Sequence, residues 1–123
     1  MPSILHLISH FVATLFVGFG VNAIVNPASA LSFFEFVHPA GAGEVGLVNS
    51  LLAVYGVRDI FMGVAIYAAA LAGTNKSLGL TMLAAGLVAA ADGYVCFVHG
   101  AGEMNHWGYA PLLVVTGGLL LGK

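Results

Sequence analysis

The chain has 123 residues, of which 60% are hydrophobic and only 7% are charged, and its mean hydropathy is +1.03. A typical soluble domain carries about 25% charged residues, so this chain has too few polar side chains to cover a surface in water. The formal net charge of −2 comes without a basic patch, which argues against a nucleic-acid partner. Composition therefore indicates an integral membrane protein surrounded by membrane lipids.

The first apolar segment ends at Asn26-Pro27, because proline disfavours helical geometry in the residue before it. The stretch 28–37 is short, aromatic and weakly polar, and we expect it to lie at the membrane interface. The second and third apolar segments flank a turn at 73–76, where a glycine marks the helix end. Trp107 and Tyr109, at the start of the fourth segment, are typical of an interfacial anchor.

About 20 apolar residues span a bilayer core of about 30 Å, so these segments predict four membrane-spanning helices. The expected fold is all-α: a single membrane domain over residues 1–123, built as an up-down-up-down four-transmembrane-helix bundle. A short interfacial segment would join helices one and two. The helices are predicted at 4–25, 44–71, 77–98 and 106–121.

One alternative concerns the first segment, because Ala28-Ser29-Ala30 has the small-residue form of a signal-peptide cleavage site. The segment has no Lys or Arg before it and is longer than a typical signal core, so we expect a membrane helix. Four spans would place both termini on one side of the membrane, together with Lys76 and Lys123. Lysines favour the cytosolic side, so the termini are expected in the cytosol, with the protein in the endoplasmic reticulum or another internal membrane.

Small residues recur every seven positions on both central helices, which is the spacing of a left-handed helix pair. Small side chains let membrane helices approach closely. If the two helices pack antiparallel about the turn at 73–76, the small residues face one another in a single register. The predicted pairs are Gly56 with Gly93, Gly63 with Gly86, and Ala70 with Gly79.

The same register brings Arg58 and Asp59 of the second helix to the depth of Asp92 on the third. Charges inside a membrane are costly and usually mark a site or a pathway. One interpretation is a structural ion pair, since a guanidinium binds a carboxylate bidentately. However, two carboxylates face one guanidinium, and a carboxyl that keeps its proton beside an ionised one makes an acid–base site. We predict a catalytic group of Asp59, Asp92, Arg58, Tyr55 and His106.

A second group of polar residues follows the third helix, where His99, Glu103 and His106 share a membrane side with His38 and Glu44. Imidazole and carboxylate ligands bind zinc or iron, so a metal site is an alternative. We favour a role at the mouth of a pocket, with no metal and no other cofactor. The predicted substrate-binding residues are Asn22, Asn49, Glu44, Cys96, His99, Glu103 and Trp107.

Three motifs carry a resemblance to a known family: Val54-Tyr55-Gly56-Val57-Arg58-Asp59-Ile60-Phe61-Met62-Gly63, Ala91-Asp92-Gly93 and Asn105-His106-Trp107-Gly108-Tyr109-Ala110-Pro111. The chain resembles a family of small fungal four-helix integral membrane proteins that is catalogued as a domain of unknown function. The resemblance implies a fungal, four-span protein whose polar layer belongs to the family pattern. It also implies proximity to biosynthetic genes for lipophilic metabolites, as for some members, but it implies no defined activity.

Nucleotide-binding motifs, nucleophile elbows and redox-cofactor motifs are absent from the sequence. The leading hypothesis is therefore a membrane-embedded enzyme that performs acid–base chemistry on a lipophilic small molecule: isomerisation, cyclisation, hydration or dehydration. A proton-coupled or small-solute transporter is one alternative, and a non-catalytic accessory subunit is another. Gly117-Gly118 in the last helix offers a surface for a homo-oligomer.

Overall fold

The computed structural model describes residues 3–123. They form α1 (Ile4–Val25), α2 (Pro27–Phe33), α3 (Ala42–Ala72), α4 (Asn75–His99), α5 (Met104–Trp107) and α6 (Ala110–Leu121), with no β-strand in this range. The predicted all-α class is confirmed. The helices α1, α3 and α4 are long and apolar enough to cross a membrane. The chain is thus a membrane protein by the length and composition of its helices.

Local capping explains where the helices begin. The Asn26 side chain accepts a hydrogen bond from the Ser29 backbone N–H, and Pro27 opens α2, so the predicted stretch after α1 is a short helix. At the next turn, Thr74 and Ser77 form a capping box in which each side chain accepts from the other residue's backbone N–H. This box starts α4 at Asn75, two residues before the predicted start.

The fourth predicted helix differs most from its expectation. Instead of one helix over 106–121, the chain forms α5 and α6 with a break at Gly108–Tyr109. Pro111 explains the break, because proline has no N–H to donate to residue 107 and its ring would clash with that residue's carbonyl. The 12 residues of α6 extend about 18 Å, which is short of the bilayer core of about 30 Å.

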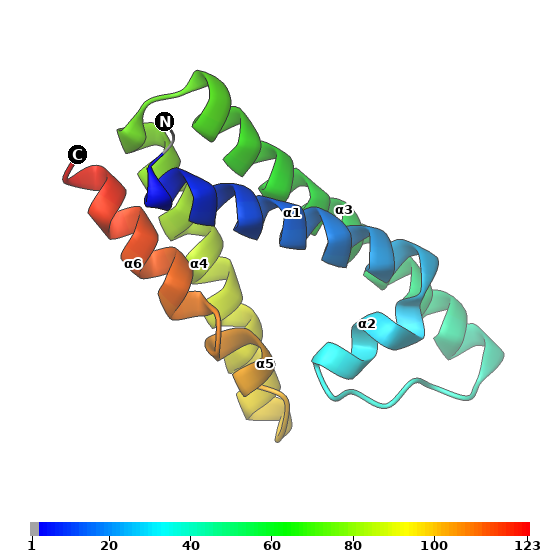
Figure 1. Cartoon of the computed structure of the whole chain (residues 1–123). Coiled ribbons are helices and arrows are strands. Elements are labelled where there is room, and N and C mark those ends of the chain that lie inside the picture. The colour runs from blue at the N-terminus through cyan, green and yellow to red at the C-terminus, as the bar shows by residue number, and fades with distance from the viewer. Residues whose placement is uncertain (1–2) are drawn as a thin grey trace.

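The helices are arranged as two antiparallel pairs, α1 with α3 and α4 with α6 (Figure 1). The pairs meet near the chain termini and the α3–α4 turn, and they diverge toward the opposite end. There α2 and α5 lie in the space between the two pairs. The molecule is therefore V-shaped, and its open end is filled by the two short helices.

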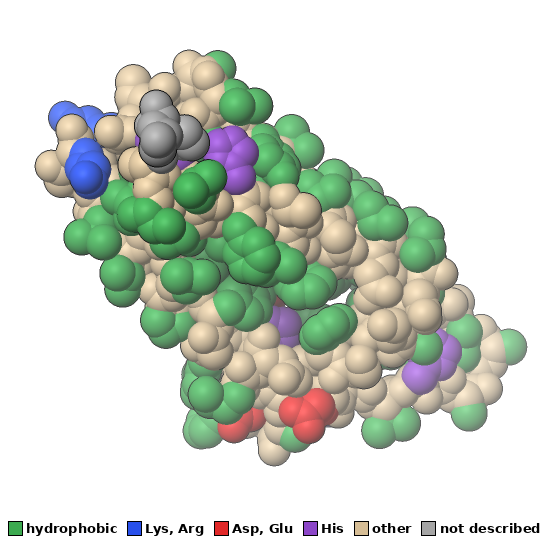
Figure 2. Space-filling view, viewed as in Figure 1, with side chains coloured by type: hydrophobic (Ala, Val, Ile, Leu, Met, Phe, Trp, Pro, Cys, Tyr) green, Lys and Arg blue, Asp and Glu red, His purple; other side chains and the backbone are tan. Residues whose placement is uncertain are grey.

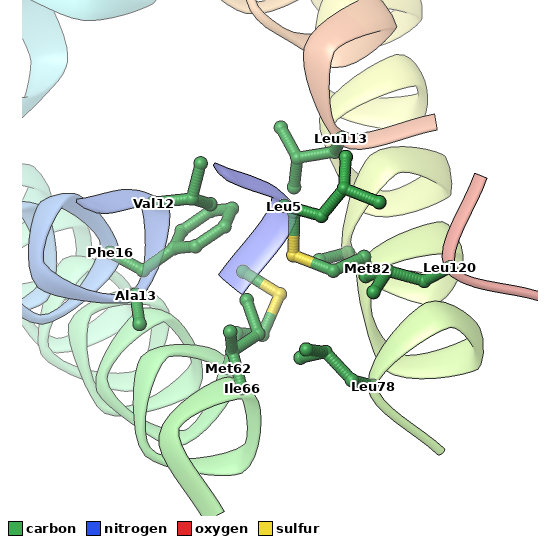
Figure 3. Packing of buried hydrophobic residues seen from close by; sticks show 11 residues of the cluster. Leu5, Val12, Ala13, Phe16, Met62, Ile66, Leu78, Met82, Leu113 and Leu120 are labelled. Atoms are coloured by element: carbon green, nitrogen blue, oxygen red, sulfur yellow. The ribbon is translucent and has the colours of Figure 1, made fainter. Parts of the chain in front are cut away.

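The hydrophobic core lies where the two pairs meet (Figure 3). The stability of a core between membrane helices comes from van der Waals packing more than from removal of water, because lipid tails are as apolar as leucine. The helices α1, α3, α4 and α6 contribute side chains, with Ile66, Leu78, Met82, Leu113 and Leu120 fully buried. The core is completed by Leu5, Val12, Ala13, Phe16, Met62 and Ala85.

The predicted glycine register between the two central helices is wrong. A Cβ on Gly56 would lie 2.5 Å from the Gly20 carbonyl oxygen of α1, and a Cβ on Gly79 would lie 2.8 Å from the Gly117 carbonyl oxygen of α6. Each small-residue stripe thus packs on the other member of its own pair. The seven-residue spacing specifies a surface for close approach, but it does not specify which helix occupies that surface.

The surface is apolar along its middle and charged at its ends. Lysine side chains lie near the chain termini, and acidic side chains lie at the opposite end of the same face (Figure 2). Hydrophobic side chains cover the face between them. This division matches the sidedness that the sequence predicts for the loops.

Candidate functional site

The predicted charged layer is present between α3 and α4. The guanidinium of Arg58 donates to both carboxylate oxygens of Asp92, from Nη1 to Oδ1 at 3.2 Å and from Nη2 to Oδ2 at 2.8 Å. Its Nη2 also donates to Oδ1 of Asp59 at 3.2 Å. The Asp59 side chain is 3% exposed and the Asp92 side chain 16% exposed. One cation therefore holds two carboxylates across the gap where the helix pairs diverge.

This arrangement leaves neither carboxylate without a cationic partner, which favours the ion-pair interpretation of the layer over a separated acid and base. The guanidinium also lies over the Tyr55 ring, 4.5 Å from its centroid, as in a cation–π contact. The layer thus fixes the Tyr55 ring on α3. The buried Nε of Arg58 has no hydrogen-bond partner among residues 3–123.

The imidazole of His106, which the sequence predicts in the catalytic group, lies buried in the site. It is 2% exposed, and neither ring nitrogen has a hydrogen-bond partner among the described residues. A buried polar group without a partner costs free energy of about 1–3 kcal/mol, so such a group needs an explanation. Ring nitrogens without a protein partner can form hydrogen bonds with a polar group of a bound small molecule.

The neighbours of His106 in sequence hold it in place. The indole Nε1 of Trp107 donates to the Ala90 carbonyl oxygen at 3.0 Å, which fixes α5 on α4. The Nδ2 of Asn105 donates to the Phe33 carbonyl oxygen at 2.9 Å, which fixes α5 on the end of α2. His106 is therefore carried between the two arms of the V by a short helix anchored on both sides.

Aromatic rings connect His106 to the charged layer. Its imidazole lies 4.6 Å from the Phe34 ring, and Phe34 lies 5.3 Å from the Tyr55 ring, measured between centroids. Tyr109 lies 6.3 Å from His106 on the other side. In its neutral form, an imidazole has one nitrogen as donor and the other as acceptor.

A cavity of about 70 Å³ adjoins the imidazole. None of the described residues that line it is an Asp, Glu, Lys or Arg, so the cavity has a mainly apolar lining with a few polar side chains and no fixed charge. It lies between α1, α2, α3 and the α5–α6 region. The lining residues are Phe19, Asn22, Ala30, Phe33, Tyr55, Asn105, His106 and Tyr109.

Comparison with known families adds one relationship. The model of a family described as a domain of unknown function (DUF4267) matches residues 13–120. The chain belongs to the DUF4267 family. The matched range includes the charged layer, His106 and the whole lining of the cavity. No curated protein and no solved structure matches the chain significantly.

The structure brings together part of the predicted site of this DUF4267 protein. Tyr55, His106 and Asn22 line one cavity, and Arg58 contacts the Tyr55 ring from the charged layer. The Asn22 Nδ2 donates to the Ser29 hydroxyl at 3.3 Å, which ties α1 to α2. These residues remain predicted for catalysis or substrate binding.

The other predicted residues lie outside the cavity lining. Asn49 is paired with His38, with 3.4 Å between Oδ1 and Nε2, and Glu44 is exposed on the first turn of α3. His99 is exposed and packs on the Phe36 ring, with 4.3 Å between centroids. The remaining three are Cys96, buried in α4, Glu103, half-buried before α5, and Trp107, packed on α4.

The alternative of a metal centre finds no ligand cluster, because no three His, Cys, Asp or Glu side chains within residues 3–123 are grouped to hold an ion. Sequence reasoning missed the aromatic part of the site: Phe19, Phe33, Phe34 and Tyr109. A signal for it exists in the sequence, since the weakly polar stretch after α1 holds three Phe within four residues, 33–36. Tyr109 follows His106 by three residues, about one helical turn.

Proposed function

We propose that this DUF4267 protein is a membrane-embedded enzyme that performs acid–base chemistry on a lipophilic small molecule. The observation that supports it best is the buried, unpartnered imidazole of His106 beside an uncharged cavity between the helix pairs. A neutral imidazole is suited to remove and return a proton near neutral pH. The reaction class is isomerisation, cyclisation, hydration or dehydration, none of which needs a redox cofactor.

In an isomerisation, one nitrogen of His106 accepts a proton from a carbon atom of the substrate. For an unsaturated ketone, the electron pair of that C–H bond forms a double bond to the carbonyl carbon, and the π electron pair of the C=O bond moves onto the oxygen, which takes the negative charge. The side chain of Tyr55 lines the same cavity, and its hydroxyl donates a hydrogen bond to this oxygen. The imidazolium then returns its proton to the far carbon of the original carbon–carbon double bond while the C=O bond re-forms, so atoms and electrons balance and the carbon–carbon double bond has moved.

The charged layer has a positioning role in this proposal. Arg58 holds the Tyr55 ring by its face, and Asp59 and Asp92 hold the guanidinium in place. This differs from the role expected for the two carboxylates as the acid–base pair, because both are engaged by one cation. The proposal keeps the predicted residues but moves the proton transfer to His106.

The membrane arrangement in this proposal has four crossings, with α5 and α6 together forming the fourth. The lysine-bearing end of the molecule, with the termini, faces the cytosol, and the end with α2 and α5 faces the lumen of an internal membrane. A lipophilic substrate reaches the cavity from the bilayer, between the arms of the V.

A mass-spectrometric comparison tests the proposal. Wild-type protein, His106→Gln and His6→Gln are purified in mild detergent from their native membranes, and the lipophiles that co-purify are extracted. We expect a discrete lipophile on the wild type and on His6→Gln, whose altered side chain does not line the cavity at His106 and is not part of the predicted site. His106→Gln is expected to carry a different isomer or none. The same bulk lipids on all three proteins would contradict an active site at His106.

A non-catalytic accessory subunit is the second candidate, and the contact of Arg58 with both carboxylates favours it. In that case the ion pair only joins α3 to α4, and the protein acts by binding another membrane protein. Loss of function in Asp92→Asn with no effect of His106→Gln would support this candidate over the enzyme.

A further inference from the structure

A second cavity, of about 90 Å³, lies between α1 and α6 and carries no polar surface of note. Its lining is entirely hydrophobic and aromatic: Val12, Leu15, Phe16, Phe19, Tyr109, Leu112 and Leu113. Three of these residues, Val12, Phe16 and Leu113, also belong to the hydrophobic core, so the cavity adjoins the core between α1 and α6.

The apolar cavity and the His106 cavity share two lining residues. These are Phe19 of α1 and Tyr109, which directly precedes α6. Phe16 and Tyr109 meet edge to face, with 6.4 Å between ring centroids, and Phe19 lies 5.3 Å from Phe33. A single ligand that passes between Phe19 and Tyr109 would therefore have a polar end at His106 and an apolar end along α1 and α6.

We propose that the two cavities form one bipartite site for an amphipathic ligand, with an uncharged oxygen-bearing head at His106 and an apolar tail between α1 and α6. This proposal rests on the proposed function, since it names the substrate class of the same site. The head is a ketone or an alcohol, because an imidazole nitrogen and a tyrosine hydroxyl both bond to such an oxygen. A carboxylate or ammonium head is disfavoured, because no Asp, Glu, Lys or Arg lines either cavity to neutralise it.

Four leucines provide matched variants for a test. Leu15 and Leu112 line the apolar cavity and are 40% and 42% exposed, so a tryptophan can enter the cavity without disturbing the core. Leu7 and Leu119 lie on the same two helices, are 52% and 55% exposed, and line neither cavity. The substitutions Leu15→Trp and Leu112→Trp fill the tail site, and Leu7→Trp and Leu119→Trp are their controls.

The probe is 2-dodecanone with a diazirine at the far end of its chain, added to the full chain in lipid nanodiscs, with a dodecane diazirine as the headless comparison. Light-induced labelling is mapped to peptides by mass spectrometry. We expect the ketone to label residues 12–19 or 109–113 about tenfold more than the alkane does. Labelling is expected to fall about tenfold in Leu15→Trp and Leu112→Trp and to stay unchanged in Leu7→Trp and Leu119→Trp.

Equal labelling in the filled and control variants would overturn the tail site. This result is independent of the proposed function, which fails only if His106→Gln has no effect. A drop in the filled variants without any drop in His106→Phe would overturn the link between head and tail, and with it His106 as the head-group site. Equal labelling by ketone and alkane would identify the cavity as a space for bulk lipid chains and overturn the proposal.

Discussion

The indole of Trp107 occupies the space that a side chain at Gly93 would fill. A Cβ at Gly93 would lie 2.2 Å from the indole Nε1, so α5 docks on α4 only because position 93 has no side chain. The indole Nε1 also donates to the Ala90 carbonyl oxygen. Since His106 precedes Trp107 on the same short helix, this contact decides where the imidazole lies.

Gly93→Ala should therefore displace the indole and move α5. We expect a red shift in fluorescence, because Trp107 is the single tryptophan of the chain and would lose its contact with α4. Overpacking of this kind costs about 1–3 kcal/mol. Gly118→Ala is the control, since a Cβ there meets no atom within 4 Å. An unchanged emission spectrum in Gly93→Ala would contradict this docking.

The two carboxylates of the charged layer should respond differently to neutralisation. Asp92→Asn removes the carboxylate that accepts two hydrogen bonds from Arg58, and we expect a loss of about 1–3 kcal/mol in the free energy of unfolding. Asp59→Asn relieves the excess negative charge of the layer while Arg58 keeps Asp92, so its cost should be below about 1 kcal/mol. Thermal unfolding in detergent measures both, and equal losses would argue against the bidentate pair as the main contact.

The close approach of α1 and α3 predicts that Gly56 does not tolerate a methyl group. In Gly56→Ala the new Cβ would lie 2.5 Å from the Gly20 carbonyl oxygen, which is backbone and cannot turn away. We expect a loss of about 1–3 kcal/mol. Gly18→Ala, on the same pair of helices, meets nothing within 4 Å and should be neutral or slightly stabilising. Similar midpoints for the two variants in detergent would show that α1 does not pack here.

The sequence predicts how deep a residue lies along the helices better than it predicts which helix packs on which face. The turn at 73–76 sets Arg58 and Asp92 at one depth in any antiparallel hairpin, so the ion pair could be predicted without knowing how the helices pack. The pairing of Gly56 with Gly93 could not, because a glycine stripe accepts any helix, and α1 takes that place through Gly20. Depth follows from counting residues along a hairpin, but a choice between packing partners depends on all the helices together.

The aromatic site shows the same limit. His106 could be singled out from its sequence position, but its environment includes the ring of Phe34, which directly follows α2, 72 residues earlier in the chain. Pro111 signals the break between α5 and α6, yet only the packed structure shows that the break carries His106 into the gap between the helix pairs. Such long-range proximity has no local pattern in the sequence.

The most direct test of His106 as the proton-transfer group is hydrogen–deuterium exchange at carbon. Full-length protein in nanodiscs is incubated in D2O with a lipid extract of its native membranes, and the extract is then searched by mass spectrometry for carbon-bound deuterium. We predict enrichment in a discrete lipophile with the wild type and a loss of about 100-fold or more with His106→Gln. No enrichment with the wild type, or the same enrichment with both proteins, would contradict the account.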